Sequence, residues 1–486
     1  MALPATGVIE IRSTATANNV NGGGFNSARG GTDYTLQNAA QLNPTDLTSV
    51  LASTTITSAI GGFTSVMVGN YIHITAGTNF VAGWYEIVTF TNANNVVVDR
   101  ACTVTADGSA GVGYVGGAMS LNSTLDDDLF EIAIAGNVFY IKAGAYTLNE
   151  SVSIAVAGSV SLEIKIEGYN TTRGDNPTEA NRPSIAFGAN TFKLGNYWTI
   201  KNVSMTGTGT NMLQGADTFS RVINCKIRNS TSTAGINAIF LNGNNCFIFK
   251  SEVISYRGAA ITNNDTRNSF LGCYLHDSNK GIRFTYLDYN THITNCIVSD
   301  NVHSNIIVES GNTADNILIQ GNTIYGAENK LGVGINFAGT ITRPRVFNNI
   351  ISGCVTGVTH PTAGQTTGFD DYNDYNNNTT DVTNWTKGSN DIAVNPAFTS
   401  VAQLTGSTAT TSGSVLTQSG GDFSTVTDNV DFVYIKSGTG VTVGKYMITS
   451  HTSDTVTLDI APGTNATADK VWQITTGHNF MPTGAI

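Results

Sequence analysis

The sequence contains few charged residues and no long apolar segment. Asp, Glu, Lys and Arg together make up 12% of its 486 residues, against roughly 25% in ordinary soluble domains. No run of 18 apolar residues occurs, which argues against a helix that spans a membrane. The net charge of −11 argues against sequence-independent nucleic-acid binding, because such binding needs a basic face. We therefore expect no nucleic-acid partner and no insertion into a membrane.

Cysteine is also scarce, and the six cysteines form no metal-binding pattern. There is no Cys-x-x-Cys pair and no Cys/His cluster with zinc spacing, so the sequence predicts neither a structural metal nor a cofactor. Cys225, Cys273 and Cys296 fall at equivalent positions of the repeat described below. Small inward-facing thiols of this kind are typical reduced packing residues, although stacked neighbours could also meet disulfide geometry.

The first twelve residues lack a secretory signal. They have neither the basic start nor the apolar core of such a signal. We therefore expect the protein to be made and folded in a cytoplasm and to reach any external location by another route.

Glycine and asparagine are plentiful, and with the apolar residues they form a long repeat. An apolar and Asn/Cys pattern returns every 22 to 27 residues, its marker residue standing at Val203, Cys225, Ser251, Cys273, Cys296, Asn322 and Asn349. A second row keeps step with it and consists of Ile239, Ile261, Ile282, Ile306, Ile335 and Val358. Self-similarity at a period of this length is the signature of a solenoid.

The repeating units are predicted to be β-strands. Their apolar residues alternate over four to six positions, as in Val222-x-Asn224-x-x-Ile227, and no segment sustains a helical period. Strands of successive coils would lie about 4.8 Å apart. Like residues would then stack into columns.

The pattern divides the chain into four parts. We expect an extended arm with one short helix around residues 44–52, a β-rich module with strands at 71–74, 85–90 and 96–99, the solenoid, and a second β-rich module. The boundaries of these parts are 1–59, 60–124, 125–400 and 401–486.

The two flanking modules are related to each other. Residues 71–87 align without a gap to residues 432–448, and the alignment matches Gly77 with Gly438 and Tyr85 with Tyr446. The matched glycines stand where hairpins must reverse. The chain therefore brackets its solenoid with two copies of one β module.

The coils resemble the right-handed parallel β-helix proteins, which include pectate lyases, other polysaccharide lyases and bacteriophage tailspikes. The likeness covers residues 125–400 and is carried by segments 138–148 and 166–175 at the opening and by Asp371-Tyr372-Asn373 and Asn395-Pro396 at the end. It implies an all-β fold with a right-handed parallel β-helix. Since the flanking modules are similar to those of phage virion proteins, it also implies a virion component, expected as a homotrimer.

The favoured function is therefore a structural, non-enzymatic role in a phage-like particle. The protein would be a tail fibre or spike, or a head decoration, located in the virion and contacting other virion proteins and a host surface glycan. The alternative is a polysaccharide depolymerase of the tailspike type. A fold of this kind hosts many activities, so the resemblance leaves both open.

The strongest candidate catalytic residues are Asp277 and Asp300. Each lies four residues after a marker cysteine, so the two should occupy equivalent turns of adjacent coils, roughly 5 Å apart. Carboxyl groups at that distance suit a retaining glycosidase, with His276 and His303 as nearby proton carriers. The alternative is that these Asp residues only bond their own backbone where strands turn.

Other candidates carry less specific signals. The tyrosines Tyr256, Tyr286 and Tyr289 are expected to be exposed and are candidates for stacking on sugar rings. The alternative is that a tyrosine at a solenoid corner packs against a partner subunit. A groove of the lyase type would need several acids and a cation on one face. Lys280, Arg283, Asp288 and Glu309 are present, but their spacing does not place them in one decisive register. The acidic groups 126–128 and Asp370, Asp371 and Asp374 could hold Ca²⁺ but are better explained as solvated turns.

Overall fold

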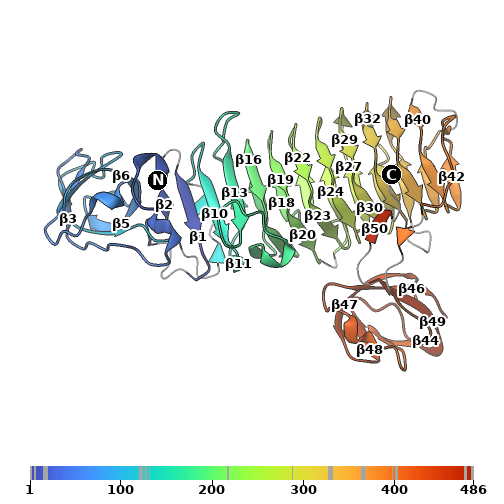
Figure 1. The fold of residues 1–486 in the computed structure, drawn as a ribbon. Coiled ribbons are helices and arrows are strands. Elements are labelled where there is room, and N and C mark those ends of the chain that lie inside the picture. Colours follow the sequence, from blue (N-terminus) through green and yellow to red (C-terminus); the bar gives the residue numbers. More distant parts are fainter. Residues whose placement is uncertain are drawn as a thin grey trace. The chain divides into compact units, whose positions relative to one another are not determined.

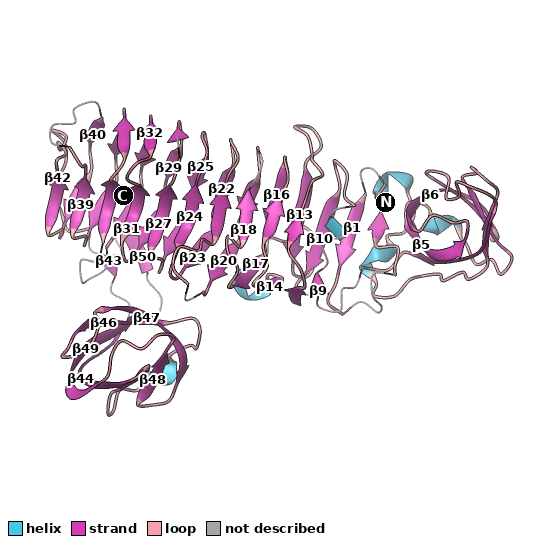
Figure 2. Cartoon of the chain, turned by 180° about the vertical axis from the view of Figure 1, so that it is seen from behind, coloured by secondary structure: helices cyan, strands magenta, loops and turns pink. Residues whose placement is uncertain are grey.

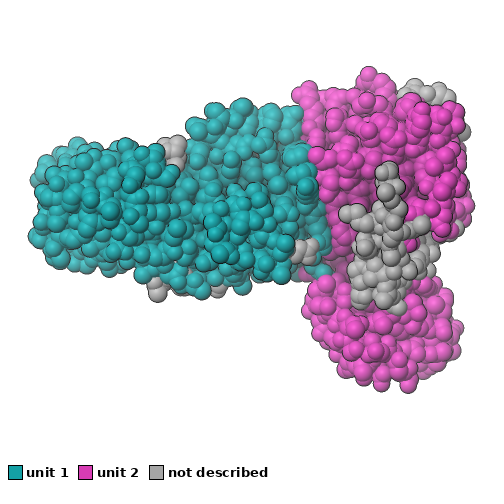
Figure 3. Space-filling model, viewed as in Figure 1, with its two compact units in different colours: residues 1–228, 240–252 teal, residues 229–239, 253–486 magenta. Residues whose placement is uncertain are grey.

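The computed structural model describes most of the chain, and strands are its main secondary structure (Figure 2). The described residues are 3–4, 7–14, 20–119, 124–125, 129–130, 132–215, 218–231, 233–286, 288–326, 332–362, 368–396, 398–399, 403–475 and 479–482. They form two compact units, residues 1–228 with 240–252 and residues 229–239 with 253–486 (Figure 3). None of the helices in this described part is long and apolar enough to cross a bilayer.

The predicted all-β fold is confirmed. The central part of the chain is a parallel β-helix of about nine turns, with a closed six-stranded barrel before it and another after it in the sequence. The short 3-10 helices are η1 (Ser27–Arg29), η2 (Tyr34–Leu36), η3 (Ser65–Met67), η4 (Glu179–Asn181) and η5 (Phe423–Thr425).

The first unit begins with a strand contributed by the arm. Strand β1 (Val8–Ile11) pairs in parallel with β10 (Val138–Lys142) and antiparallel with β2 (Gly24–Phe25). Glu10 on β1 is fully buried, and its carboxylate accepts hydrogen bonds from Arg12 and Arg173. A buried carboxylate is stable only when it is paired in this way. The arm is therefore fixed as part of the β-helix.

The first barrel follows the arm. Its strands close in the order β3 (Leu47–Ser49), β4 (Thr55–Ser58), β7 (Asn95–Val98), β6 (Gly83–Asn92), β5 (Tyr71–Thr78) and β8 (Gly108–Val115). The helix expected around residues 44–52 was wrong, because Leu47 and Ser49 pair with strands β4 and β8 instead. Barrel closure supplies hydrogen bonds that an isolated helix of so few residues cannot match.

Each coil of the β-helix contributes up to three main strands, called A, B and C here in their order along the coil (Figure 1), and some coils of the second unit add a short fourth strand. In the first unit the remaining A strands are β13 (Ile164–Tyr169), β16 (Trp198–Lys201), β19 (Arg221–Ile223) and β22 (Phe247–Phe249). The B strands are β9 (Thr124–Leu125), β11 (Ala145–Leu148), β14 (Ser184–Gly188) and β17 (Ser204–Gly207), and the C strands are β12 (Val152–Ser153), β15 (Phe192–Leu194) and β18 (Leu213–Gly215). Strands β20 (Lys226–Asn229), β21 (Ile239–Leu241) and β23 (Glu252–Ser255) contain residues of both units.

The second unit continues the same coil pattern. Its A strands are β25 (Ser269–Leu271), β29 (His292–Thr294), β33 (Leu318–Gln320), β37 (Arg345–Phe347) and β40 (Phe369–Asp371). Its B strands are β26 (Tyr274–His276), β30 (Ile297–Ser299), β34 (Thr323–Tyr325), β38 (Ile350–Ser352) and β41 (Asp374–Asn376). Its C strands are β24 (Ala259–Asn263), β27 (Lys280–Phe284), β31 (Ser304–Val308), β35 (Val333–Phe337), β39 (Thr356–Thr359) and β42 (Thr380–Thr383). A short fourth face consists of β28 (Asp288–Tyr289), β32 (Thr313–Asp315) and β36 (Thr340–Thr342).

The predicted isoleucine row is confirmed in the second unit. The register pairs Ile261 with Ile282, Ile282 with Ile306, Ile306 with Ile335 and Ile335 with Val358. All five side chains are buried. The row is therefore a column of the core.

The corner between the A and B strands explains the recurring asparagine. Its first residue adopts the left-handed region, with φ of 51° at Asn224, 53° at Asn295 and 56° at Asn348, a conformation that asparagine and glycine tolerate best. The second residue is often an asparagine as well. The amide Oδ1 of Asn349 accepts from the backbone N–H of Asn322 at 3.0 Å, so successive corners are joined side chain to backbone.

The cysteines are reduced packing residues, as predicted. The six thiols are free and buried. Burial raises the pKa of Cys225 to about 11 and, together with contact to Cys273, raises the pKa of Cys296. The thiol of Cys296 donates to the Phe270 carbonyl at 3.5 Å. The cysteines therefore fill the core, and disulfides do not form among them.

The second barrel has the topology of the first. Its strands close in the order β44 (Gln403–Ser412), β45 (Val415–Thr417), β48 (Thr455–Leu458), β47 (Gly444–His451), β46 (Phe432–Ser437) and β49 (Asn465–Thr475). Strands β43 (Phe398–Thr399) and β50 (Asn479–Pro482) flank this barrel in the sequence and pair with each other. The predicted relationship between the two modules is confirmed by this shared strand order.

Candidate functional site

Asp277 and Asp300 follow neighbouring B strands at equivalent positions. Strands β26 and β30 pair His276 with Ser299, and each Asp comes next, with φ of 55° at both. The expected register is therefore present. Both residues take the left-handed conformation that a tight corner requires.

The environments of the two carboxyl groups differ from those of an open catalytic pair. Asp277 forms an ion pair with Lys445 of the second barrel, and its Oδ2 lies within hydrogen-bonding distance of His276 Nδ1, at 2.7 Å. Asp300 is only 4% exposed, and its charge contributes, after burial, to raising the pKa of Cys354 to about 12. One carboxylate is thus paired with a barrel lysine and the other is largely buried. A sugar ring would have no open access to the pair.

The two histidines are placed near these corners but serve local contacts. His276 stacks on Tyr274 with ring centroids 3.8 Å apart and is largely buried. His303 Nδ1 lies 2.9 Å from the Ser304 hydroxyl. Burial, and then the charge of Lys280, lowers the pKa of His303.

The three candidate tyrosines divide into one buried and two exposed residues. The expectation that Tyr256 is exposed was wrong, because it is 3% exposed and packs on Phe432 of the second barrel at 5.1 Å between ring centroids. Tyr286 and Tyr289 are exposed. The Arg267 guanidinium lies over the Tyr289 ring at 5.4 Å. Only Tyr286 and Tyr289 therefore offer surface for stacking.

Of the groove residues, Lys280, Arg283 and Glu309 lie together, whereas Asp288 lies apart from them. Glu309 forms ion pairs with Lys280 at 2.5 Å and with Arg283 at 2.7 Å. Burial opposes ionisation of Glu309, yet the hydrogen bonds from both cations keep its pKa below the usual value. Asp288 does not join this group. It is buried, accepts from Thr291 and Asn263, and burial raises its pKa to about 7.

The acidic groups considered for Ca²⁺ do not form a shared site. Asp370 accepts from the Tyr375 hydroxyl at 2.9 Å and from Trp385 Nε1, Asp371 accepts from Asn390, and Asp374 accepts from the backbone of Val394. Across the described ranges, no three His, Cys, Asp or Glu side chains gather as a metal site requires. Residues 126–128 lie outside the described residues.

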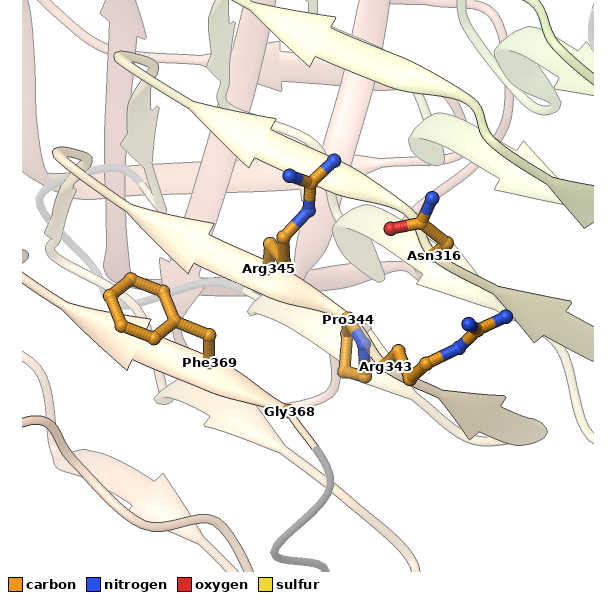
Figure 4. A pocket seen from close by; sticks show the side chains of 6 residues that line it. All are labelled: Asn316, Arg343, Pro344, Arg345, Gly368 and Phe369. Carbon is orange, nitrogen blue, oxygen red and sulfur yellow. The ribbon is translucent and has the colours of Figure 1, made fainter.

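A pocket on the second unit escaped the sequence reasoning. It has a volume of about 360 Å³ and is lined by Asn316, Arg343, Pro344, Arg345, Gly368 and Phe369 (Figure 4). Arg345 and Phe369 begin adjacent A strands and are register partners. Arg345 and Phe369 each stand four positions before the second residue of a corner, Asn349 and Asn373, but no feature of the repeat indicates that a pocket lies there.

Comparison with known proteins finds likeness of fold alone. No protein-family model and no curated protein matches the chain. A PL6-family polysaccharide lyase from Pseudopedobacter saltans is similar over 51% of this chain and 72% of its own, with 14% identity and a TM-score of 0.36. Pectate lyase Pel9A matches over 58% and 78%, with 11% identity and a TM-score of 0.32. The tailspike protein gp49 of Pseudomonas phage LKA1 matches over 90% and 81%, with 12% identity and a TM-score of 0.23.

Proposed function

We propose that this chain is a structural protein of a phage-like particle, a stiff β-helical spike or fibre, or a head decoration, that contacts a host surface glycan without cleaving it. The observation that carries the proposal is the state of the best candidate acids. Asp277 is held by Lys445 and Asp300 is buried, whereas a glycosidase needs both carboxyl groups to reach the scissile bond.

The β-helix supports a mechanical role. Parallel strands of successive coils are joined by backbone hydrogen bonds, and buried columns such as Ile282–Ile306–Ile335 fill the interior. The amide of Asn349 adds hydrogen bonds between corners. Such a rod resists bending and proteolysis because local opening would expose several coils at once.

The outer face of the first unit supports oligomerisation. Phe247 and Phe249 lie on the outward side of β22, are only partly buried, and stack with ring centroids 5.7 Å apart. Aromatic residues are enriched in subunit interfaces. We propose a homotrimer that covers this aromatic pair, because closed symmetry buries the same patch on every subunit.

One observation favours the alternative, a polysaccharide depolymerase. His303, whose lowered pKa leaves it neutral at pH 7, lies near Lys280 and Glu309. A neutral imidazole beside cations is suited to remove a proton next to a sugar carboxylate. Glu309, however, already forms ion pairs with both Lys280 and Arg283.

The test is incubation of the purified protein with host capsule or lipopolysaccharide. The non-enzymatic proposal predicts binding to the glycan without new reducing ends and without unsaturated products. Product that disappears in Asp277→Ala or Asp300→Ala would overturn it in favour of a glycosidase. Product that survives these changes but disappears in His303→Ala would overturn it in favour of a lyase. Sedimentation of the same sample tests the trimer.

A further inference from the structure

The pocket around Arg345 is built by the first residues of the adjacent A strands β37 and β40, by the residues just before these strands and by Asn316. Strands β33, β37 and β40 pair Leu318 with Arg345 and Arg345 with Phe369. The middle residues Ile319 and Val346 are fully buried. Because side chains alternate along a strand, Leu318, Arg345 and Phe369 point outward, on strands about 4.8 Å apart.

The pocket offers a cation beside an open aromatic ring. Figure 4 shows the Arg345 side chain between Phe369 on one side and Asn316 on the other. Phe369 is 49% exposed. Gly368 allows the backbone to pack closely on Pro344, since a Cβ there would lie 2.9 Å from Pro344 Cγ.

The two arginines of the pocket differ in their partners. The Arg343 guanidinium donates to both carboxylate oxygens of Asp315, with Nε at 2.9 Å from Oδ1. Within the described part of the chain, Arg345 has no ion pair, and its buried Nε has no hydrogen-bond acceptor. Because this Nε is shielded from solvent, a ligand carboxylate would bind the terminal N–H groups of the Arg345 guanidinium.

The surroundings of Arg345 leave its charge uncompensated. The nearby imidazole of His292 has a pKa lowered by burial and then by Arg345 itself, so it is neutral at pH 7. A guanidinium binds a carboxylate with two parallel hydrogen bonds. An exposed phenyl ring packs against the apolar face of a sugar ring in the same way that it packs against other flat apolar groups.

We propose that this pocket binds a saccharide residue that carries a carboxylate, with Arg345 holding the carboxylate and Phe369 packing on the ring. The inference rests on the proposed glycan-contacting role and names the chemical class of the glycan. A volume of about 360 Å³ lies in the range of sites that hold small ligands. Since the pocket lies on a surface of short, in-register strands, the rest of the glycan chain can continue along neighbouring coils.

The experiment measures binding of oligogalacturonate to the full-length protein by calorimetry. A neutral galactose oligomer and a sulfated galactose oligomer of equal length are the comparison ligands. The variants are Arg345→Gln and Phe369→Ala. Arg221→Gln is the matched control, because Arg221 also begins an A strand, lies outside the pocket and is already paired with Glu163. Thermal unfolding of each variant verifies that it is folded.

We expect oligogalacturonate to bind and the neutral oligomer to bind at least about tenfold more weakly. Arg345→Gln should weaken oligogalacturonate binding about tenfold or more and Phe369→Ala about fivefold, whereas Arg221→Gln should stay within about twofold. Raising the salt concentration should weaken binding by the wild type but not by Arg345→Gln.

The proposal is overturned if oligogalacturonate does not bind, if the sulfated or neutral oligomer binds as tightly, or if Arg345→Gln binds like the wild type. A changed oligomeric state of Arg345→Gln with unchanged saccharide binding would also overturn it and assign the pocket to a subunit interface. Host-cell binding separates the two proposals. Protein that binds cells but not oligogalacturonate refutes this site alone, whereas protein that binds no host glycan refutes the proposed function.

Discussion

The two barrels share one strand order but use the same face for different partners. In the first barrel, His73 and Trp84 stack with centroids 4.0 Å apart and contact the backbone of Val20 and Asn21 in the arm. Glu86 beside them accepts from Arg29 at 2.6 Å. This face therefore holds the segment that precedes the barrel.

In the second barrel, the residues aligned with Trp84 and Glu86 are Lys445 and Met447. Lys445 forms the ion pair with Asp277, and Met447 packs with Tyr256 and Phe432 in a small buried cluster. The Tyr256 hydroxyl donates to Asp459 Oδ1 at 3.0 Å and accepts from the Met447 N–H. This face therefore holds a corner of the β-helix.

The comparison shows what is constant and what varies in the module. Asp99 and Asp459 occupy equivalent positions in the two barrels. Asp99 accepts a hydrogen bond from the backbone N–H of Glu86 at 2.9 Å, and Asp459 accepts one from the backbone N–H of Met447, the residue aligned with Glu86, at 3.0 Å. This bond maintains the shape of the face. The neighbouring side chains select the partner.

The largest expected effect comes from Tyr256→Ala. The change removes an aromatic ring buried against Phe432 and the bonds of its hydroxyl, and such truncations destabilise by about 3 kcal/mol or more. Hydrogen exchange at the Met447 amide should accelerate about a hundredfold. Tyr286→Ala, at an exposed residue, should leave that amide unchanged. Equal protection in both variants would mean that the ring does not hold the barrel.

The next prediction is that the free energy of unfolding depends on pH through a residue of the coils and not through either barrel face. Burial raises the pKa of Asp288 to about 7, whereas an unfolded Asp ionises near 4. The folded state thus binds the proton more tightly, so this stabilisation is fully present below about pH 4 and is lost as the pH rises to about 7. Denaturant titrations should show this decline in the wild type and a shallower one in Asp288→Asn. Identical slopes would contradict the assignment.

Glu86→Ala should loosen the first barrel's hold on the arm. The change removes a nearly buried carboxylate bonded to Arg29 and Asn26, and loss of such charged hydrogen bonds is expected to destabilise by about 1 to 2 kcal/mol. Exchange of the amides in residues 20–30 should increase about tenfold. Glu167→Ala, which breaks only the ion pair with Lys201, is the control and should not change this segment.

A double-mutant cycle sharpens the comparison at the second barrel. Lys445→Met and Asp277→Asn should show a coupling energy of about 1 kcal/mol, because both side chains are largely shielded from water. The cycle is read from the unfolding free energies of the four proteins. Additive single changes would show that the ion pair contributes nothing to docking.

The smallest expected effect comes from a substitution in the β-helix, outside both barrels. Lys250 occupies a corner with φ of 48°, where asparagine stands in other coils. Lys250→Asn should stabilise the protein by about 0.5 to 1 kcal/mol, because asparagine adopts the left-handed region more readily. The contact of Lys250 Nζ with the Phe249 ring at 5.1 Å is lost and reduces the gain. Chemical denaturation measures it, and a loss of stability would show that the ring contact outweighs the strain.

The features that could be predicted are those that depend on residues close together in the sequence. The marker cysteines and the isoleucine row could be predicted because each coil repeats the same short pattern, and the register of Asp277 with Asp300 followed from it. The partners of these residues could not be predicted. Lys445 lies 168 residues from Asp277, and nothing near Tyr256 signals that a barrel covers it. Arg345 and Phe369 were missed because their neighbourhood depends on how each corner sets the register.

The asparagine corners have a consequence for how such a rod changes length. The N–H of Asn349 donates to Asn373 Oδ1 at 3.1 Å, while Asn349 Oδ1 accepts from Asn322 at 3.0 Å. Every coil with this corner therefore presents one donor edge and one acceptor edge that match those of the next. Gene duplication of a whole coil would preserve all of these bonds, so evolution can lengthen or shorten the rod by complete windings without redesigning its ends.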